Sequence, residues 1–215
     1  MKREKGLTDF GKRIVKRMNK LGMLIDVSHA GEQTFWDVIA TTTKPVIASH
    51  SSVYSISPQF RNLKDEQIKA IAKNGGVIQI NFAAGFLDST FYRKVAPYIA
   101  RHKNESDSLV KLKWGGSSVG SLFTKKYAGE LTDILPPLSV VLNHIDYIVK
   151  LVGIDYIGLG SDFDGIPYSP HELEDVSKFP NITKGLVERG YKKKEINKIL
   201  GGNFIRVFQK NMNRN

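Results

Sequence analysis

Three side chains that can bind a metal or move a proton each stand at the end of a short apolar segment: His29, His50 and Asp162. Neutral imidazole is the commonest metal ligand among side chains, and a carboxylate beside a metal can bind it or take a proton from its bound water. A single histidine in such a position is more often structural. Three such residues at equivalent positions, 21 and 112 residues apart, favour a metal or acid/base site.

The apolar segments are short and are preceded by helical patterns. We expect strands over 23–28, 46–49, 76–82 and 156–160. Apolar residues at helical spacing predict helices over 10–21, 31–42, 64–73, 91–102 and 138–151, and three more near 180–190, 193–200 and 202–212. This alternation indicates a parallel α/β sheet, in which functional groups gather at the carboxyl ends of the strands. The pattern does not separate an open sheet from a barrel.

The segment 83–136 departs from the alternation. Within it, residues 106–127 are polar and include the run Gly115-Gly116-Ser117-Ser118, which is typical of a loop. We therefore expect residues 1–215 to form one domain, in which 83–136 is an insertion or mobile region.

The 215-residue chain is long enough to bury a substantial core, and its composition is ordinary for a globular protein, 41% hydrophobic and 25% charged. It has no cysteine, which excludes disulfides, thiolate metal sites and cysteine nucleophiles. No run of about 18 apolar residues predicts a transmembrane helix, and the charged start lacks the apolar run of a signal peptide. We expect a cytoplasmic protein with no membrane partner.

The net charge of +11 is unevenly spread along the chain. Residues 1–20 carry eight basic and two acidic side chains, residues 184–215 carry nine and two, and residues 21–183 have a net charge of −2. A nucleic-acid reader usually carries its basic stripe where its recognition residues lie. Here the excess lies on terminal helical segments away from the candidate site, so we do not expect a nucleic-acid partner.

Several segments carry a family resemblance. They are Gly22-Met23-Leu24-Ile25-Asp26-Val27-Ser28-His29, Pro45-Val46-Ile47-Ala48-Ser49-His50-Ser51-Ser52, Arg61-Asn62, Gly158-Leu159-Gly160-Ser161-Asp162-Phe163-Asp164-Gly165, and the stretches 173–178 and 202–208. In this order they resemble the renal, or membrane, dipeptidase family of zinc peptidases. The fourth is similar to that family's Gly-x-Gly-x-Asp-Phe-Asp-Gly signature. The likeness runs from about residue 6 to residue 208 and is weakest over 83–136.

The resemblance implies a (β/α)₈ barrel that holds two bridged zinc ions and hydrolyses dipeptides with a metal-activated hydroxide. His29 and His50 match the two histidines that bind the second zinc. Asp162 matches the acid/base aspartate. Arg61 matches the arginine that holds the carboxyl-terminal carboxylate of the substrate, a task that suits a guanidinium group.

The family site also needs a His-x-Asp pair on its first strand, a glutamate that bridges the metals and a further substrate-facing histidine. None has an equivalent place in this sequence. The one His-x-Asp, His144-Ile145-Asp146, lies in an expected helix. The resemblance therefore implies the C-terminal half of the barrel, about strands five to eight, with at most one partial zinc site.

Two functions remain open at this point. The chain is a zinc-dependent dipeptidase that is truncated or split at its N-terminal side, or it is a non-catalytic half-barrel module that assembles with another chain. The corresponding partners are a dipeptide substrate, a second copy of the chain, or a missing N-terminal half. Asp26, inside an expected strand, needs a partner if it is buried, and orienting His29 is one option.

Overall fold

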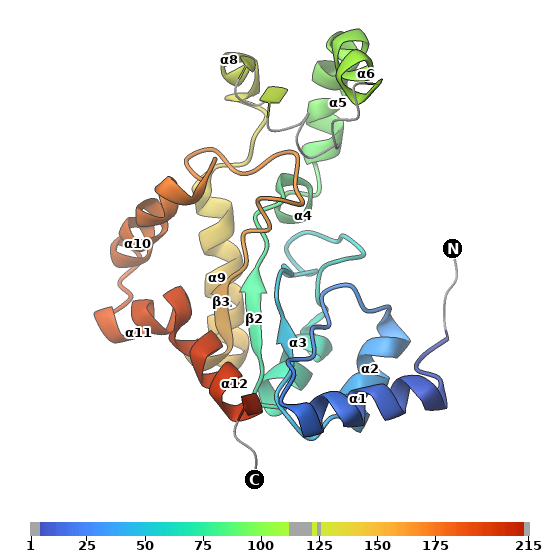
Figure 1. The fold of residues 1–215 in the computed structure, drawn as a ribbon. Coiled ribbons are helices and arrows are strands. Elements are labelled where there is room, and N and C mark those ends of the chain that lie inside the picture. Colours follow the sequence, from blue (N-terminus) through green and yellow to red (C-terminus); the bar gives the residue numbers. More distant parts are fainter. Residues whose placement is uncertain (1–4, 112–121, 124–125, 213–215) are drawn as a thin grey trace.

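A short parallel sheet lies at the centre of the computed structural model, which describes residues 5–111, 122–123 and 126–212 (Figure 1). Its strands are β1 (Ile47–Ala48), β2 (Val77–Ile80) and β3 (Ile157–Leu159), and they lie side by side in chain order. Ala48 is opposite Ile78, which is in turn opposite Ile157. Most strand residues are buried, as expected for a parallel sheet covered on both faces.

The segment before β1 extends the sheet by a single bridge. Asp26 pairs in parallel with Ile47. The amide of Val27 donates to the carbonyl of Ile47 at 2.8 Å, and the amide of Ile47 donates to the carbonyl of Ile25 at 2.9 Å. The expected strand over 23–28 is therefore wrong in extent, because only its centre pairs with a neighbour. Its place beside β1 is as the sequence predicts.

Most expected helices are present. The helices in the described part of the chain are α1 (Asp9–Leu21), α2 (Glu32–Thr41), α3 (Asp65–Lys73), α4 (Ala84–Leu87), α5 (Phe91–Arg101), α6 (Lys103–Lys111), α8 (Ala128–Leu131), α9 (Leu138–Val152), α10 (Phe179–Glu188), α11 (Lys193–Asn197) and α12 (Asn203–Met212). Short 3₁₀ turns cover Ile154–Tyr156 and Val176–Lys178, and a π-type segment covers Lys198–Gly202. The expected helix near 193–200 is thus divided in two.

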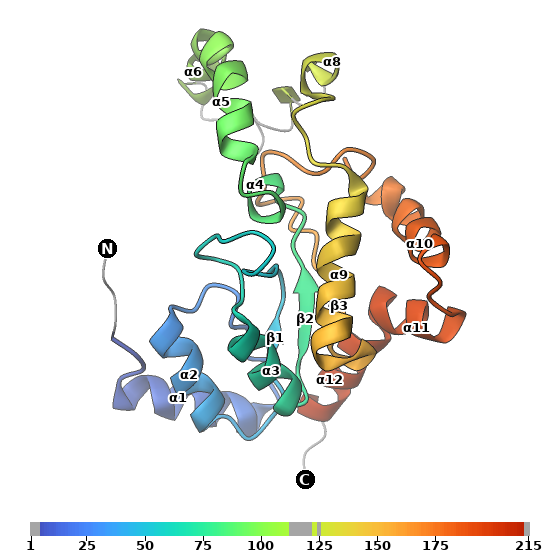
Figure 2. The same ribbon diagram turned by 180° about the vertical axis from the view of Figure 1, so that it is seen from behind.

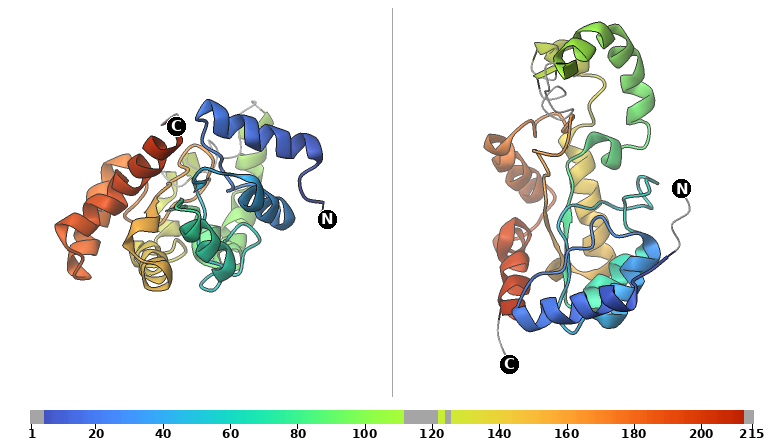
Figure 3. Two further views of the ribbon diagram at one scale, coloured as in Figure 1. Left: turned by 90° about the horizontal axis from the view of Figure 1, so that it is seen from below. Right: turned by 45° about the vertical axis from the view of Figure 1, so that its right-hand side comes forward.

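The helices curve around the strands, and the carboxyl end of α12 lies beside the end of α1, where a Cβ at Gly22 would lie 3.4 Å from the Cα of Met212 (Figure 3). Helices α3 and α9 lie against the same face of the sheet and contact each other (Figure 2). The apolar side of α9 is fully buried there through Val141, Ile145 and Ile148. The main core is therefore the layer between the sheet and these helices.

The region 83–136 contains more helix than the sequence predicts. Helices α4, α5, α6 and α8 all lie in it, and α6 replaces part of the expected loop over 106–127. A second apolar cluster, which includes Phe91, Val95 and Leu131, joins α5 to α8. The Gly/Ser run over 115–118 lies outside the described residues.

The carboxyl-terminal helix α12 is hydrogen-bonded to the backbone at the amino ends of β2 and β3. The Asn203 side chain donates to the carbonyls of Ile154 and Ile157, both at 2.8 Å. Arg206 donates to three carbonyls that precede the two strands, those of Gly75, Gly76 and Asp155. These contacts leave the carboxyl ends of the strands free to carry other groups. Among the described helices, none is both long and apolar enough to cross a membrane.

Candidate metal centre and substrate pocket

His29 and His50 lie side by side beyond the carboxyl ends of neighbouring segments. Asp26 and Ile47, which are 21 residues apart in the sequence, are opposite each other in the parallel pair. His29 and His50 are also 21 residues apart, so they follow their segments at the same level. Their Nε2 atoms are 2.8 Å apart, and their ring centroids are 4.9 Å apart with a tilt of 58°. The structure therefore brings together two of the three residues that the sequence predicts to converge.

Arg61 completes a contact cluster with these histidines. Its Nη2 lies 3.3 Å from His50 Nε2, its Nε donates to the carbonyl of Ser28 at 3.1 Å, and its guanidinium stacks over the ring of Phe86. Desolvation, followed by the charge of Arg61 and the charge that His50 carries when protonated, lowers the pKa of His29, although Asp26 and Asp162 oppose this. The surroundings favour neutral His29, the form that binds metals.

Asp26 is held by the two serines that precede the histidines. Its Oδ1 accepts from the amide and hydroxyl of Ser28 at 3.0 and 2.9 Å and from the amide of Ser49 at 3.1 Å, while its Oδ2 accepts from the Ser49 hydroxyl. Partial desolvation alone would raise the pKa of Asp26, but these hydrogen bonds together lower it. Orienting His29 is one option for Asp26, but its carboxylate bonds to Ser28 and Ser49. The Ser49 hydroxyl in turn contacts the His50 ring.

Asp162 lies in the turn after β3. Its backbone is left-handed, with φ 59°, and its carbonyl accepts from the amide of Gly165 at 2.9 Å. Fully buried Asn81, which follows β2, donates to Asp162 Oδ2 at 3.2 Å. A Cβ at Gly165 would lie 2.4 Å from Asp162 Oδ1, so Gly165 leaves the space that this carboxylate occupies.

The four predicted site residues therefore fall into two groups. His29, His50 and Arg61 are in direct contact, whereas Asp162 is held by Asn81 and acts on His29 and Arg61 through its charge. Sequence reasoning missed Ser49 as a partner of His50. The available signal was that a serine directly precedes both His29 and His50.

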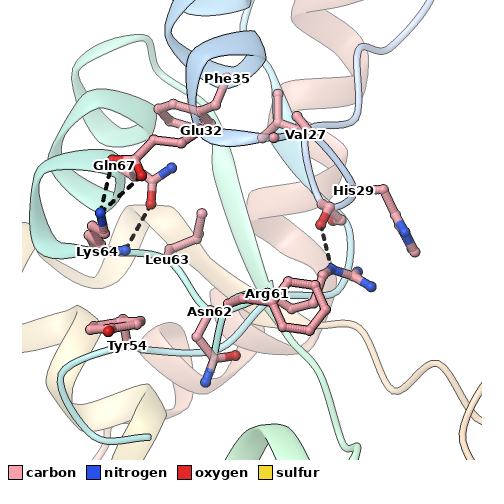
Figure 4. Close-up of a pocket in the computed structure, with 14 residues that line it drawn as sticks. Val27, His29, Glu32, Phe35, Tyr54, Arg61, Asn62, Leu63, Lys64 and Gln67 are labelled. Atoms are coloured by element: carbon pink, nitrogen blue, oxygen red, sulfur yellow. Dashed lines mark hydrogen bonds and ion pairs between the residues drawn. The ribbon is translucent and has the colours of Figure 1, made fainter. Parts of the chain in front are cut away.

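A pocket of about 410 Å³ opens beside His29 and Arg61. Val27, Phe35 and Leu63 form part of its apolar wall, and Lys64 and Glu32 pair on another side at 2.9 Å (Figure 4). The pocket has the size and mixed lining of a small-molecule site.

The two imidazoles suit a zinc ion in donor chemistry. Zinc holds histidine nitrogens at about 2.0–2.1 Å, so two tetrahedral ligands are about 3.4 Å apart and the rings would separate slightly from their present 2.8 Å. Among residues 5–111, 122–123 and 126–212, no group of three or more His, Asp or Glu side chains is placed to hold a metal. Catalytic zinc usually has three protein ligands, so these residues fit part of a metal site.

The whole chain, residues 1–215, matches the family model of the membrane dipeptidases, peptidase family M19. It is 35% identical to an uncharacterized protein of the pqqA 5′ region of Klebsiella pneumoniae over 95% of this chain and 60% of that protein. It is 32% identical to an uncharacterized dipeptidase of Schizosaccharomyces pombe over 96% of this chain and 40% of the relative.

Solved structures give the same result. The probable dipeptidase PvdM of Pseudomonas aeruginosa superposes with a TM-score of 0.75 at 31% identity, over 96% of this chain and 55% of that one. A metallopeptidase of Rhodobacter sphaeroides, liganded with a phosphinate mimic of the dipeptide L-Ala-D-Ala, superposes with a TM-score of 0.73 at 26% identity, over 96% and 48%. The chain thus spans about 40–60% of the length of these relatives. The resemblance seen in its motifs is confirmed: this chain belongs to the membrane dipeptidase family, peptidase family M19.

Proposed function

We propose that this chain carries the C-terminal half of a metal-dependent dipeptidase in which His29 and His50 bind a zinc ion. The proposal depends on one observation above all, the 2.8 Å approach of the two imidazole nitrogens beside Arg61 at adjacent strand ends. Without a metal, one of these nitrogens donates a hydrogen bond to the other. A metal ion in place of that proton would use the lone pairs of both nitrogens. Family membership supports a metal and a dipeptide substrate.

The roles of the remaining residues follow from their surroundings. A bound zinc ion would supply activation of a water molecule and polarisation of the scissile carbonyl. Asp162 would carry the proton between the attacking water and the leaving amine, and the Asn81 amide keeps its Oδ2 in place. Arg61 would hold the carboxyl-terminal carboxylate of a dipeptide with its remaining guanidinium donors.

We also propose that the fold is half of a (β/α)₈ barrel, about strands five to eight, completed by further polypeptide that brings the other metal ligands. The share of each relative that the chain spans supports this. So do the exposed apolar side chains of α1 and α12. On α1 they are Phe10, Ile14 and Leu21, and on α12 they are Ile205, Phe208 and Met212. Such surfaces usually pack against a partner.

The same exposed surfaces favour the second candidate function, a non-catalytic half-barrel module that binds another chain or a second copy. Light scattering during size-exclusion chromatography distinguishes a monomer from an assembly of two or more copies of the chain. A monomer at every concentration contradicts the self-assembling module.

Metal titration with matched variants tests the proposed function. The chain is titrated with Zn²⁺ by calorimetry and with Co²⁺ by visible absorption, alongside His29→Ala, His50→Ala and the control His171→Ala, whose histidine is exposed. We expect each site variant to lose at least about tenfold in affinity and the control to keep it. Equal affinity in all four proteins would refute the site. Hydrolysis of dipeptides, by the chain alone or with an added N-terminal half, tests the reaction.

A further inference from the structure

The carboxylate of Asp26 is connected to the His50 ring through one hydroxyl group. Ser49 Oγ lies against Asp26 Oδ2 on one side and 2.7 Å from His50 Nδ1 on the other. Ser28 adds a second connection, because its hydroxyl donates to Asp26 Oδ1 and accepts from the backbone amide of His50 at 3.0 Å. Both the ring and the backbone of His50 are thus held from the same carboxylate.

The direction of each proton in this chain can be assigned. An ionised carboxylate only accepts hydrogen bonds, and the amides of Ser28 and Ser49 already donate to Asp26 Oδ1. The Ser49 hydroxyl must therefore donate its single proton to Asp26 Oδ2. Its oxygen is then free only to accept, so the proton between Ser49 and His50 belongs to His50 Nδ1.

The opposite side of the His50 ring requires the same tautomer. Arg61 has only donors, and its Nη2 lies 3.3 Å from His50 Nε2, which must present a lone pair to accept this contact. The same lone pair faces His29 Nε2 at 2.8 Å. Among the hydrogen bonds of the described residues, none reaches His29 Nδ1, so the two histidines are held unequally.

We propose that Asp26 is a positioning residue for His50: through the Ser49 hydroxyl it keeps the proton on His50 Nδ1 and leaves the Nε2 lone pair directed toward the metal position. The inference deepens the proposed function and rests on it for one point, the role of His50 Nε2 as a metal ligand. The tautomer of His50 follows from the hydrogen bonds of the chain without a metal. Hydrogen bonds of this kind to the non-ligating nitrogen commonly fix the orientation of metal-binding histidines.

Exchange of Asp26 for asparagine should reverse the donor and acceptor roles of the Ser49 hydroxyl and His50 Nδ1. In Asp26→Asn, the amide oxygen takes the place of Oδ1 and accepts from the Ser28 and Ser49 amides, so the NH₂ group faces Ser49 Oγ and donates to it. The Ser49 hydroxyl must then donate to His50 Nδ1, and the ring proton moves to Nε2. A protonated Nε2 cannot bind a metal, so the affinity for zinc falls.

Long-range ¹H–¹⁵N correlation spectra of the full chain, freed of metal with a chelator and held at about pH 8, above the ordinary imidazole pKa, report the tautomer directly. We expect the Nδ1-protonated form of His50 in the unmodified chain and in Ser49→Thr, and the Nε2-protonated form in Asp26→Asn. Ser49→Ala removes the acceptor and should give a mixture. Ser55→Ala is the matched control, because Ser55 donates to Asp65 at 2.9 Å away from the site.

Zinc titration of the same proteins gives the second measurement. Asp26→Asn and Ser49→Ala should bind zinc about 10- to 100-fold more weakly, and Ser49→Thr and Ser55→Ala should bind as the unmodified chain does. An Nε2-protonated His50 in the unmodified chain, or an unchanged His50 spectrum in Asp26→Asn, would overturn the inference. If Asp26→Asn does not fold, an unchanged tautomer in Ser49→Ala overturns it instead. The expected tautomers without any zinc binding would refute the proposed function and leave the positioning intact.

Discussion

Gly160 faces the backbone carbonyl of Ser49 at a distance that leaves no room for a side chain. A Cβ at Gly160 would lie 1.8 Å from the Ser49 oxygen and 2.9 Å from the Cβ of Gln79. The chain after β3 can therefore approach the end of β1 only because residue 160 is glycine. Since Ser49 precedes His50, a side chain at residue 160 would push on the segment that carries His50.

Gly160→Ala should accordingly disturb both stability and the site. We expect a loss of about 1–3 kcal/mol in the free energy of unfolding from overpacking, and weaker zinc binding because the Ser49–His50 segment must move. Gly129→Ala is the control, because nothing lies within 4 Å of its Cβ and residue 129 is in helix α8. Urea unfolding and zinc titration of both variants check this. Equal behaviour of the two would contradict a steric role for Gly160.

The convergence of His29 and His50 could be predicted because it depends only on strand order and on the length of each strand. The links around them could not. The sequence leaves the partner of Asp26 open, and its carboxylate bonds to Ser28 and Ser49, since the direction of a side chain at the edge of a sheet depends on packing that no local pattern encodes. The roles of His29 and His50 as ligands, of Asp162 in proton transfer and of Arg61 in substrate binding stay predictions.

Two elements differ from expectation for identifiable reasons. The segment 23–28 pairs with β1 on one side only, among the residues that the structure describes, and so forms a bridge at Asp26 instead of a strand. Helix α6 has too few apolar residues for a periodic signal. The Lys103–Asp107 ion pair, one turn apart, supports it locally.

Asn81→Ala should separate the Asp162 carboxylate from its support. The buried Asn81 side chain donates to Asp162 Oδ2 and accepts from the amide of Ala83. Its loss should cost about 1–3 kcal/mol in unfolding free energy and lower kcat for dipeptide hydrolysis by at least about tenfold, with zinc affinity unchanged.

The matched control for Asn81 is Asn203→Ala, which removes another buried asparagine at the opposite ends of the strands. It should cost similar stability without lowering kcat. Kinetics are measured on the chain combined with the N-terminal half that the proposed function requires. If kcat falls by the same factor in Asn81→Ala and Asn203→Ala, the loss of activity in Asn81→Ala results from general destabilisation and not from the contact with Asp162.

Arg61→Lys should remove recognition of the substrate carboxylate while it keeps a positive charge. A lysine cannot make the two nitrogen contacts to Ser28 and His50 together with the stack on Phe86. We expect KM for a dipeptide to rise about 10- to 100-fold. The measurement compares a dipeptide with the same dipeptide amidated at its carboxyl end. The unmodified enzyme should prefer the free acid, and the variant should lose most of that preference. A preference that survives would place the carboxylate elsewhere.

His144 should make the stability of the fold depend on pH. It is fully buried in α9, where its Nδ1 accepts from the amide of Val53 at 3.0 Å and its Nε2 donates to the carbonyl of Leu87 at 3.2 Å. These contacts need the neutral ring. Burial lowers the pKa of His144 to about 4 from the ordinary 6.5, although the bond to Leu87 opposes the shift.

Because the pKa is lower in the folded state, the unfolded chain takes up the proton first as the pH falls. The contribution of His144 to stability is therefore complete above about pH 6.5, decreases between about pH 6.5 and 4, and is lost below that, a change of about 3 kcal/mol. His144→Gln keeps one acceptor and one donor but does not titrate. Between pH 7.5 and 4, its unfolding free energy should therefore decrease by about 3 kcal/mol less than that of the unmodified chain. His171→Gln, at an exposed histidine, should follow the unmodified chain. If urea unfolding gives the same slope with pH for His144→Gln and the unmodified chain, acid sensitivity arises from other groups.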